Sequence, residues 1–264
     1  MKKADIIIFG GQSNMQGQTE RLSESEIVEN GFEYKWMADF ITPLKNPVGE
    51  SVTINKTPGY GPFLNCPAHP WLEEHVFGAA CYGYTNMVPS FCRAYIKETN
   101  NTVIAVHSAK GSTKISYWIP GTLGFECIKE KALAAINKAK EEYEIGNIFF
   151  VWLQGESDAC ASVKKEEYKE MLLKLWEGLK EIGVQKFGIV RVGRFAGDER
   201  DDEIINAQEE ICEENENFVM LTRETERISN IPEYMSTVFA GHYNAKGQEL
   251  LGNAAGKKFS EYAK

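Results

Sequence analysis

The run Ile6-Ile7-Ile8-Phe9-Gly10-Gly11-Gln12-Ser13-Asn14-Met15 decides the fold that we expect for this chain. Its apolar part is too short for the core of a signal peptide or for a membrane span, so it is interpreted as a first buried strand. The glycines that follow let the chain turn sharply, and the next residues can open a helical turn with free backbone N–H groups. A serine at this place has an exposed hydroxyl and a backbone N–H directed at incoming negative charge, as acyl transfer requires.

The rest of the chain alternates between short apolar runs and longer amphipathic ones. Strands are predicted at 102–107, 147–153, 187–192 and 218–221, and helices at 89–98, 127–143, 166–182, 203–214 and 245–262. Because these strands are apolar throughout rather than on one face, they are typical of a parallel sheet covered on both sides. We expect an α/β fold, a three-layer α/β/α sandwich with a parallel sheet, as a single domain over 1–264 with a loop-rich insertion at about 16–88.

The insertion at 16–88 is rich in proline, glycine and aromatic residues. Its aromatic residues include Trp36, Tyr60, Phe63, Trp71, Tyr82 and Tyr84. A long loop beside a compact sheet is usually functional, and aromatic side chains suit a sugar-binding wall, although they equally suit a loop pinned to the core. His69 and His75 have no metal-ligand spacing to each other, so we expect no metal.

Composition excludes several classes of partner. The 264 residues are 43% hydrophobic, which suffices for one sizeable core, and the net charge is −9 with a pI of about 5.2. Without a basic cluster, neither nucleic acid nor a membrane surface is an expected partner. The six cysteines lack paired spacing and no secretion signal is seen, so reduced thiols in a cytoplasmic protein are predicted, with disulfides as the alternative. The oligomeric state is not predicted.

Polar residues that follow strands are the natural candidates for a site, because open parallel sheets bind ligands at the carboxyl ends of their strands. Gly111 follows the strand at 103–106 and can offer an unobstructed backbone N–H. Gln154 ends another buried strand and can turn its amide into the same cleft. With the N–H of Ser13 these groups would form an oxyanion hole of three donors. His242 precedes the last helix, where it can reach Ser13.

Three blocks in this order resemble one enzyme family. They are Gly11-Gln12-Ser13-Asn14-Met15, Gln154-Gly155-Glu156-Ser157-Asp158 and His242-Tyr243-Asn244-Ala245-Lys246-Gly247. They are similar to the motif blocks of the sialate O-acetylesterase and acetylxylan-esterase branch of the SGNH hydrolases. The segment 111–118 is similar to a further block of that branch. The resemblance implies the flavodoxin-like SGNH-hydrolase fold, a serine esterase that deacetylates a carbohydrate, and no cofactor.

The resemblance also implies roles for single residues. Ser13 is the nucleophile and His242 its general base. The oxyanion is held by the N–H groups of Ser13 and Gly111 and by the Gln154 amide, and residues expected to contact the substrate are Gln12, Asn14 and Trp118.

One position departs from the family pattern. The branch usually has an aspartate three residues before the histidine, to orient its ring, but this chain has Phe239 there and no acid between Tyr234 and His242. Glu156 is the candidate substitute, because it follows the strand that presents Gln154. Its alternative role is to brace that turn, and a backbone carbonyl could then orient the ring.

Other interpretations of the same residues remain open. Ser13 could cap a helix, and His242 could cap the last helix or hydrogen-bond a carbonyl. Glu156 and Asp158 could form a paired-carboxylate site of the kind used in glycoside hydrolysis, and His107 is expected to pack at a strand end. At the level of function, the alternatives are a lipase or thioesterase on the same fold, or a sugar-binding protein without catalysis.

Overall fold

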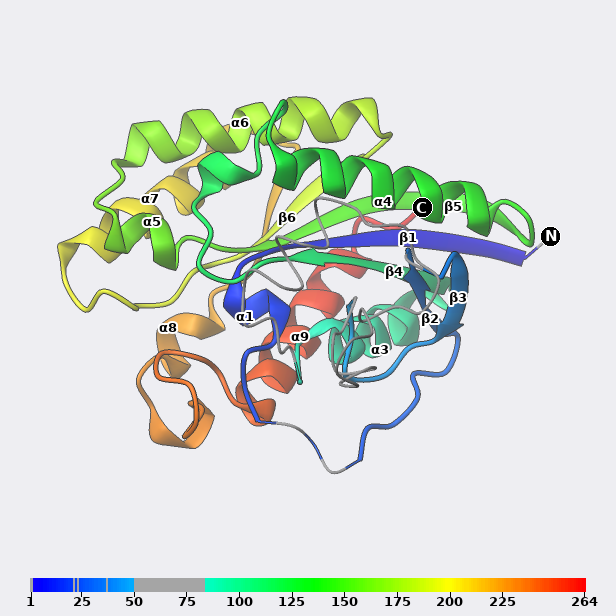
Figure 1. Ribbon diagram of the computed structural model, residues 1–264, viewed down its shortest axis with the longest axis horizontal. Coiled ribbons are helices and arrows are strands. Elements are labelled where there is room, and N and C mark those ends of the chain that lie inside the picture. Colours follow the sequence, from blue (N-terminus) through cyan, green and yellow to red (C-terminus); the bar gives the residue numbers. More distant parts are fainter. Residues whose placement is uncertain (1, 21, 23, 37, 50–83) are drawn as a thin grey trace, which may run out of the picture.

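A single mostly parallel sheet organises the chain, as seen in a computed structural model that describes residues 2–20, 22, 24–36, 38–49 and 84–264. The strand order is β3-β2-β4-β1-β5-β6-β7 (Figure 1). The strands are β1 (Lys2–Gly11), β2 (Gly31–Lys35), β3 (Phe40–Pro43), β4 (Thr102–Ala109), β5 (Tyr143–Leu153), β6 (Lys186–Val190) and β7 (Phe218–Thr222). Neighbouring strands are parallel except β2 and β3, which are antiparallel.

Helices cover both faces of this sheet. The helices are α1 (Ser13–Gln16), α3 (Val88–Thr99), α4 (Leu123–Ala139), α5 (Glu156–Cys160), α6 (Lys165–Glu181), α7 (Glu199–Glu214), α8 (Glu224–Ile228) and α9 (Ala245–Ser260). In Figure 1, α4, α6 and α7 lie on one side of the sheet, whereas α3 and α9 lie on the other. The predicted three-layer α/β/α fold is confirmed.

Burial on both faces explains why the middle of the central strand β1, residues 6–9, is apolar without interruption. Ile6 and Ile8 belong to the core beneath α4 and α6, whereas Ile7 and Phe9 belong to the core beneath α3 and α9. Successive side chains of a strand point to opposite faces, so a strand covered on both faces buries all of them. All four side chains are 0% exposed, and each such burial contributes roughly 1.5–3 kcal/mol.

The stretch 16–88 contains more regular structure than the sequence predicted. The strand β2 pairs with β4 and extends the sheet, and β3 returns beside it. The charged residue Glu33 interrupts the apolar pattern of β2, yet it is 1% exposed, pairs with Lys35 at 2.8 Å and accepts the Gly49 N–H at 2.6 Å. Because this charged residue is buried as an ion pair within the strand, the sequence lacks the apolar pattern by which β2 could have been predicted. Several residues considered above lie outside the described residues: Tyr60, Phe63, Cys66, His69, Trp71, His75, Cys81 and Tyr82.

Three strands end together and so position the site. The register places Gly11 of β1 beside Ala109 of β4 and Leu153 of β5. Backbone hydrogen bonds continue past the strand ends, from Gln12 N–H to the Leu153 carbonyl at 3.1 Å and from Lys110 N–H to the Gly11 carbonyl at 3.0 Å. The segments that follow β1, β4 and β5 therefore run side by side.

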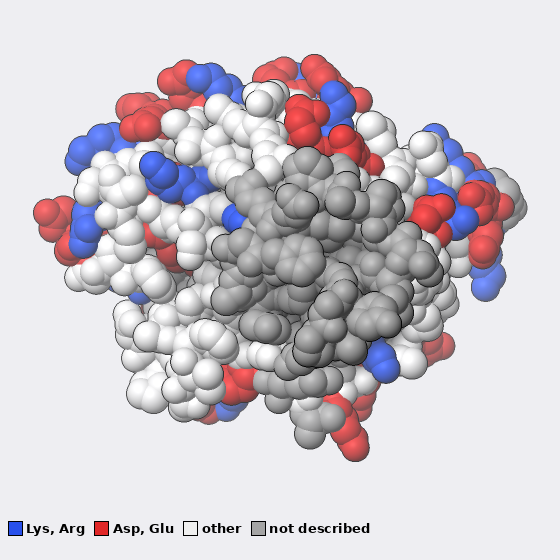
Figure 2. Space-filling model, in the orientation of Figure 1, with Lys and Arg blue, Asp and Glu red and all other residues white. Residues whose placement is uncertain are grey.

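Charges of both signs lie on the visible surface of the protein (Figure 2). On the face shown in Figure 2, basic and acidic side chains are interspersed rather than gathered by sign. Among the described cysteines, Cys92, Cys127, Cys160 and Cys212 form no disulfide. Within the described ranges, no helix has the length and apolar character that crossing a membrane requires.

Candidate active site

Ser13 begins α1 directly after a turn that only glycine can make. Gly11 has a φ of +149°, and a Cβ there would lie 2.1 Å from the Leu153 carbonyl oxygen. Gln12, not Ser13, is the N-cap residue of α1, and no side chain caps that end. Within the described residues, no hydrogen bond involves the Ser13 hydroxyl. The helix-cap interpretation of Ser13 is therefore wrong. The sequence predicted an exposed hydroxyl, whereas Ser13 is only 6% exposed.

His242 is held in the tautomer that a general base requires. Its Nδ1 lies 2.8 Å from the Ala240 carbonyl oxygen, and since a carbonyl only accepts, Nδ1 carries the hydrogen. A neutral ring then has its lone pair on Nε2. That nitrogen is buried and has no hydrogen-bond partner among the described residues. The last helix is capped by Asn244, which accepts the Gly247 N–H at 3.0 Å, so His242 is free of that role.

Asn14, the residue after Ser13, is hydrogen-bonded to Tyr243, the residue after His242. Its Oδ1 accepts the Tyr243 N–H at 3.1 Å, and its backbone carbonyl accepts from Gln248 Nε2 at 2.9 Å. Asn14 is 2% exposed, so these bonds are shielded from water. Ser13 and His242 are thus brought to the same end of the sheet, on the two sides of a single buried hydrogen bond.

Two phenylalanines flank the His242 ring. The ring centroids of Phe195 and Phe239 lie 6.3 Å and 6.2 Å from that of His242. Gly241, with a φ of +75°, allows the close approach, since a Cβ there would lie 2.1 Å from the Phe195 ring. Sequence reasoning missed Phe195, because nothing near it in the sequence marks a loop that approaches His242.

The backbone N–H of Gly111 already has an acceptor. It donates to Oε1 of Gln16, the last residue of α1, at 2.7 Å. Gln16 is 5% exposed, and no local sequence pattern predicts this contact. His107 packs at its strand end as predicted, with Nε2 3.0 Å from the Met15 carbonyl oxygen. The Gly111 N–H, which the sequence predicted as a donor to the oxyanion, is therefore hydrogen-bonded to the amide oxygen of Gln16 in this structure.

Gln154 is turned into the protein interior. Its Nε2 donates to the Thr113 carbonyl at 2.9 Å, to Gln12 Oε1 at 3.2 Å and to Asp158. Its Oε1 accepts the Tyr168 hydroxyl at 2.9 Å, and the residue is 0% exposed. Both amide hydrogens are used within the protein, so in this structure Gln154 braces the strand end and has no free N–H for an oxyanion.

A family model and several solved structures match this chain. The model described as carbohydrate esterase, sialic acid-specific acetylesterase matches residues 3–261. The chain belongs to this family. Comparison with curated proteins found no match. The predicted class of function, an esterase that removes acetyl groups from a carbohydrate, is confirmed by the family.

Solved structures agree at the level of the fold. A protein from Arabidopsis thaliana is 17% identical with a TM-score of 0.63, and 98% of each chain is covered. NanS is 13% identical with a TM-score of 0.58 over 99% of this chain and 96% of its own. A carbohydrate acetylesterase from Xanthomonas citri is 14% identical with a TM-score of 0.52, over 98% of this chain and 57% of its own.

In this carbohydrate esterase, the carboxylates brace the site rather than orient the histidine. Glu156 is 3% exposed and accepts from Asn14 Nδ2 at 2.8 Å, whereas the Ala240 carbonyl orients His242. The proposed contact between Glu156 and the His242 ring is therefore corrected. Burial raises the pKa of Glu156, and the bond from Asn14 offsets part of that rise.

Asp158 is engaged in the same way. It is 1% exposed and accepts the Ile115 N–H at 3.0 Å as well as the Gln154 amide. Burial raises its pKa to about 6 against the lowering effect of these hydrogen bonds. Both carboxylates are buried, and each accepts a hydrogen bond from a protein group, although Glu156 Oε2 has no partner among the described residues. Two carboxylates buried in this way do not present the open acid/base pair that glycoside hydrolysis uses. Among the described residues, no three His, Cys, Asp or Glu side chains are grouped as metal ligands.

The residues expected to contact substrate are instead packing residues. Gln12 Oε1 accepts the Ser157 N–H at 3.1 Å, and the Asn14 side chain is used as described above. Trp118 is 0% exposed and packs edge-on against Trp152, with ring centroids 6.0 Å apart. The structure corrects this prediction, because all of these side chains hold the segments after β1, β4 and β5 together.

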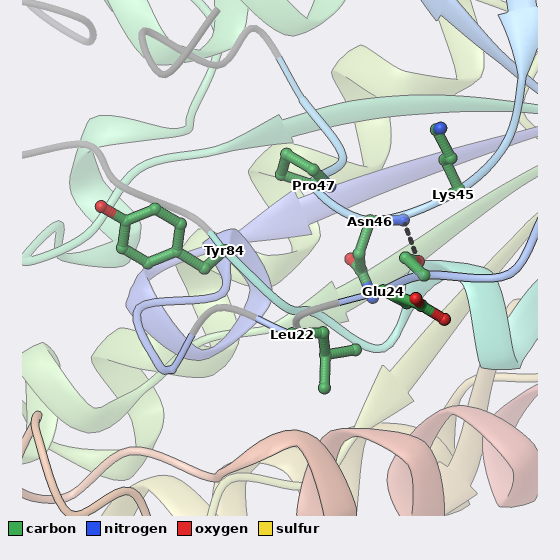
Figure 3. A pocket seen from close by; sticks show the side chains of 7 residues that line it. Leu22, Glu24, Lys45, Asn46, Pro47 and Tyr84 are labelled. Atoms are coloured by element: carbon green, nitrogen blue, oxygen red, sulfur yellow. Dashed lines mark hydrogen bonds between the residues drawn. The ribbon is translucent and has the colours of Figure 1, made fainter.

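A pocket of about 480 Å³ lies between three segments of the insertion (Figure 3). Its lining residues are Leu22, Glu24, Ser25, Lys45, Asn46, Pro47 and Tyr84. The backbone N–H of Tyr84 donates to the Gly17 carbonyl at 2.8 Å, which ties this wall to α1. Trp36 packs against the core instead. Of these two aromatic residues of the insertion, one lines a pocket and the other pins the chain to the core.

Proposed function

We propose that this protein removes O-acetyl groups from a carbohydrate through an acetyl-enzyme formed on Ser13, with His242 as the general base. The observation that carries the proposal is the His242 ring, whose Nδ1 is fixed by the Ala240 carbonyl and whose Nε2 is buried without a partner among the described residues. The link from Asn14 to Tyr243 N–H supports an approach of this nitrogen to Ser13.

The reaction proceeds in two half-reactions. Nε2 of His242 accepts the Ser13 proton as Oγ forms a bond to the acetyl carbon, and the carbonyl oxygen becomes an oxyanion. When the intermediate collapses, the bond from the acetyl carbon to the sugar oxygen breaks, and His242 returns the proton to that oxygen. Water then attacks the acetyl group by the same route, which releases acetate and restores Ser13.

The oxyanion is held by the backbone N–H groups of Ser13 and Gly111. The substrate carbonyl oxygen replaces Gln16 Oε1 as the acceptor at Gly111, so the oxygen of an ester carbonyl takes the place of an amide oxygen. Losing one such donor in comparable enzymes costs on the order of 3 kcal/mol of transition-state stabilisation. Gln154 supports this arrangement by fixing the carbonyl of Thr113, two residues after Gly111.

The Ala240 carbonyl replaces only part of what an aspartate would supply. It fixes the tautomer and the direction of the ring, but it carries no full negative charge to stabilise the imidazolium that forms during the reaction. The mechanism requires the neutral ring, because a protonated imidazole cannot act as the base.

Hydrolysis of p-nitrophenyl acetate tests the catalytic part of the proposal. Ser13→Ala is expected to lose nearly all activity and to keep its thermal unfolding temperature, because the hydroxyl is the nucleophile and contributes little packing. The matched control is Ser157→Ala, a serine at the neighbouring strand end that is expected to keep full activity. Equal activity of Ser13→Ala and wild type would exclude Ser13 as nucleophile, and an inactive wild type would favour a sugar-binding protein.

A substrate panel tests the chemical class. Acetylated sialic acid and acetylated xylo-oligosaccharides are compared with p-nitrophenyl esters of longer acyl chains. Acetylated sugars are expected to give the highest kcat/KM. A rise of kcat/KM with acyl length would instead indicate a lipase or thioesterase on this fold.

A further inference from the structure

An acid from the other end of the chain is bound to the loop that carries His242. Residues 236–242 form this loop, called here the His242 loop, and it contains no acidic residue. Its ends are closed by an antiparallel bridge between Met235 and Tyr243 and by a hydrogen bond from Ser236 N–H to the His242 carbonyl at 2.7 Å. Any displacement of Ser236 is thus transmitted directly to the His242 backbone.

Glu20 binds the start of the His242 loop through one carboxylate oxygen. Its Oε1 accepts the Ser236 hydroxyl at 2.8 Å, the Thr237 N–H at 2.7 Å and the Thr237 hydroxyl at 3.3 Å. The other oxygen accepts from Thr19. The Glu20 backbone is itself anchored, because its carbonyl accepts the Thr85 hydroxyl at 2.9 Å. Contacts outside the His242 loop therefore hold Glu20 in place independently of the loop.

Ser236 passes this anchoring further along the loop. While its hydroxyl donates to Glu20, its Oγ accepts the N–H groups of Val238 and Phe239, each at 3.1 Å. The Phe239 carbonyl in turn accepts the His242 N–H at 3.2 Å. One charged group thus fixes the backbone up to His242 without touching its ring.

The charge of Glu20 is maintained by these contacts. Burial alone would raise its pKa, but hydrogen bonds from Thr19, from its own N–H, from Ser236 and from Thr237 outweigh that effect and lower the pKa to about 2. Hydrogen bonds to an ionised acceptor are roughly twice as strong as those between neutral groups. Glu233, the nearest acid before the loop in the sequence, pairs with Lys246 instead.

We infer that Glu20 is a positioning residue for His242, and that it supplies by way of the loop backbone what the missing aspartate at position 239 would supply at the ring. The inference rests on the proposed role of His242 as the base. It predicts a dependence of turnover on Glu20 without a direct electrostatic effect on the imidazole.

The test compares kcat, KM and the pH dependence of kcat/KM on p-nitrophenyl acetate. Glu20→Ala is expected to lower kcat by roughly 10-fold with KM little changed, since losing hydrogen bonds to a charged group reduces the fraction of molecules with a productive loop. Glu20→Gln keeps an acceptor oxygen and should recover most of that loss. The acid limb of the pH profile should stay where it is in wild type. Glu26→Ala, which removes an exposed acid from the same segment, is the matched control and should behave like wild type.

Two results would overturn the inference: Glu20→Ala with the activity of Glu26→Ala, or an acid limb displaced by a full pH unit, which would mean that Glu20 acts on the ring itself. If Glu20→Ala does not fold, Glu20→Gln and Ser236→Ala decide the question by the same criteria. Ser13→Ala and His242→Asn are assayed in parallel. Full activity in either would refute the proposed function, whereas inactivity in both with a normal Glu20→Ala would refute only the positioning role.

Discussion

The two sides of the candidate site hold their carboxylates in opposite ways. On the serine side, Glu156 and Asp158 are almost completely buried, and burial raises both pKa values. On the histidine side, Glu20 is only partly buried, and its hydrogen bonds lower its pKa to about 2. The difference teaches that the strand ends around Ser13 are fixed by an enclosed hydrogen-bond network. The loop of His242 is fixed from outside by a charge.

The largest effect is expected from removing the base. His242→Asn should lower kcat by about 10²–10⁴-fold, the usual contribution of a positioned general base, because no other titratable side chain contacts Nε2 among the described residues. Ester hydrolysis at pH 7 measures this, with circular dichroism to check the fold. A variant that keeps more than half of the wild-type kcat would show that the histidine side of the comparison is not catalytic.

The next effect concerns the enclosed network on the serine side. Gln154→Ala should reduce kcat by roughly 10²-fold and also lower the free energy of unfolding by about 1–3 kcal/mol, because Asp158 and Tyr168 lose a buried partner. Kinetics and urea unfolding are measured on the same preparation. A loss of kcat with unchanged stability would mean that Gln154 contributes to catalysis directly rather than by bracing the strand end.

A gain is expected at Gln16. Gln16→Ala frees the Gly111 N–H, which the substrate otherwise has to win from the Gln16 amide oxygen, so kcat/KM should rise by roughly 2–10-fold. Gln18→Ala is the comparison, because Gln18 Nε2 donates to Gln16 Oε1 at 3.4 Å and lies against Gly111 without accepting its N–H, so this variant loosens Gln16 without removing the competing oxygen. A fall in kcat/KM for Gln16→Ala would indicate that this amide positions Gly111 instead of competing for it.

The smallest effect on activity, but a clear one on stability, concerns Asp158. Because its pKa is raised from 3.8 to about 6 in the folded protein, its contribution to stability is fully present below pH 3.8 and is lost as the pH rises through 6. Between pH 4 and pH 7, wild type should therefore lose about 1–3 kcal/mol relative to Asp158→Asn. Urea unfolding at several pH values measures this. Parallel curves for the two proteins would contradict the assignment.

Glu20 should show the opposite sign in the same experiment. Its lowered pKa stabilises the folded protein above pH 4.5, and this contribution is lost as the pH falls toward 2. The free energy of unfolding of wild type should therefore exceed that of Glu20→Gln near neutral pH, and this difference should shrink as the solution is acidified. If the difference in unfolding free energy between wild type and variant changed with pH in the same direction for Glu20→Gln and Asp158→Asn, the two sides of the site would not differ in the way described.

The sequence predicted the sheet and the elements around the site well, because the central parts of β1 (6–9), β4 (103–106) and β5 (149–153) are apolar and buried on both faces. It also placed Ser13 and His242 at the end of the sheet where the structure brings them. It missed β2, since the buried Glu33 breaks the apolar pattern. Side-chain partners could not be predicted in the same way. Contacts such as Gln16 with Gly111 or Glu20 with Ser236 join residues 95 and 216 positions apart, and no local pattern encodes them.

Covalent labelling of the serine tests the central claim most directly. A fluorophosphonate is reacted with wild type, Ser13→Ala and His242→Asn, and the labelled peptide is identified by mass spectrometry. The account predicts one label per chain on Ser13, no label in Ser13→Ala, and labelling slowed by about 10²-fold or more in His242→Asn. A label on another serine, or equal labelling rates in wild type and His242→Asn, would contradict the Ser13 and His242 pair.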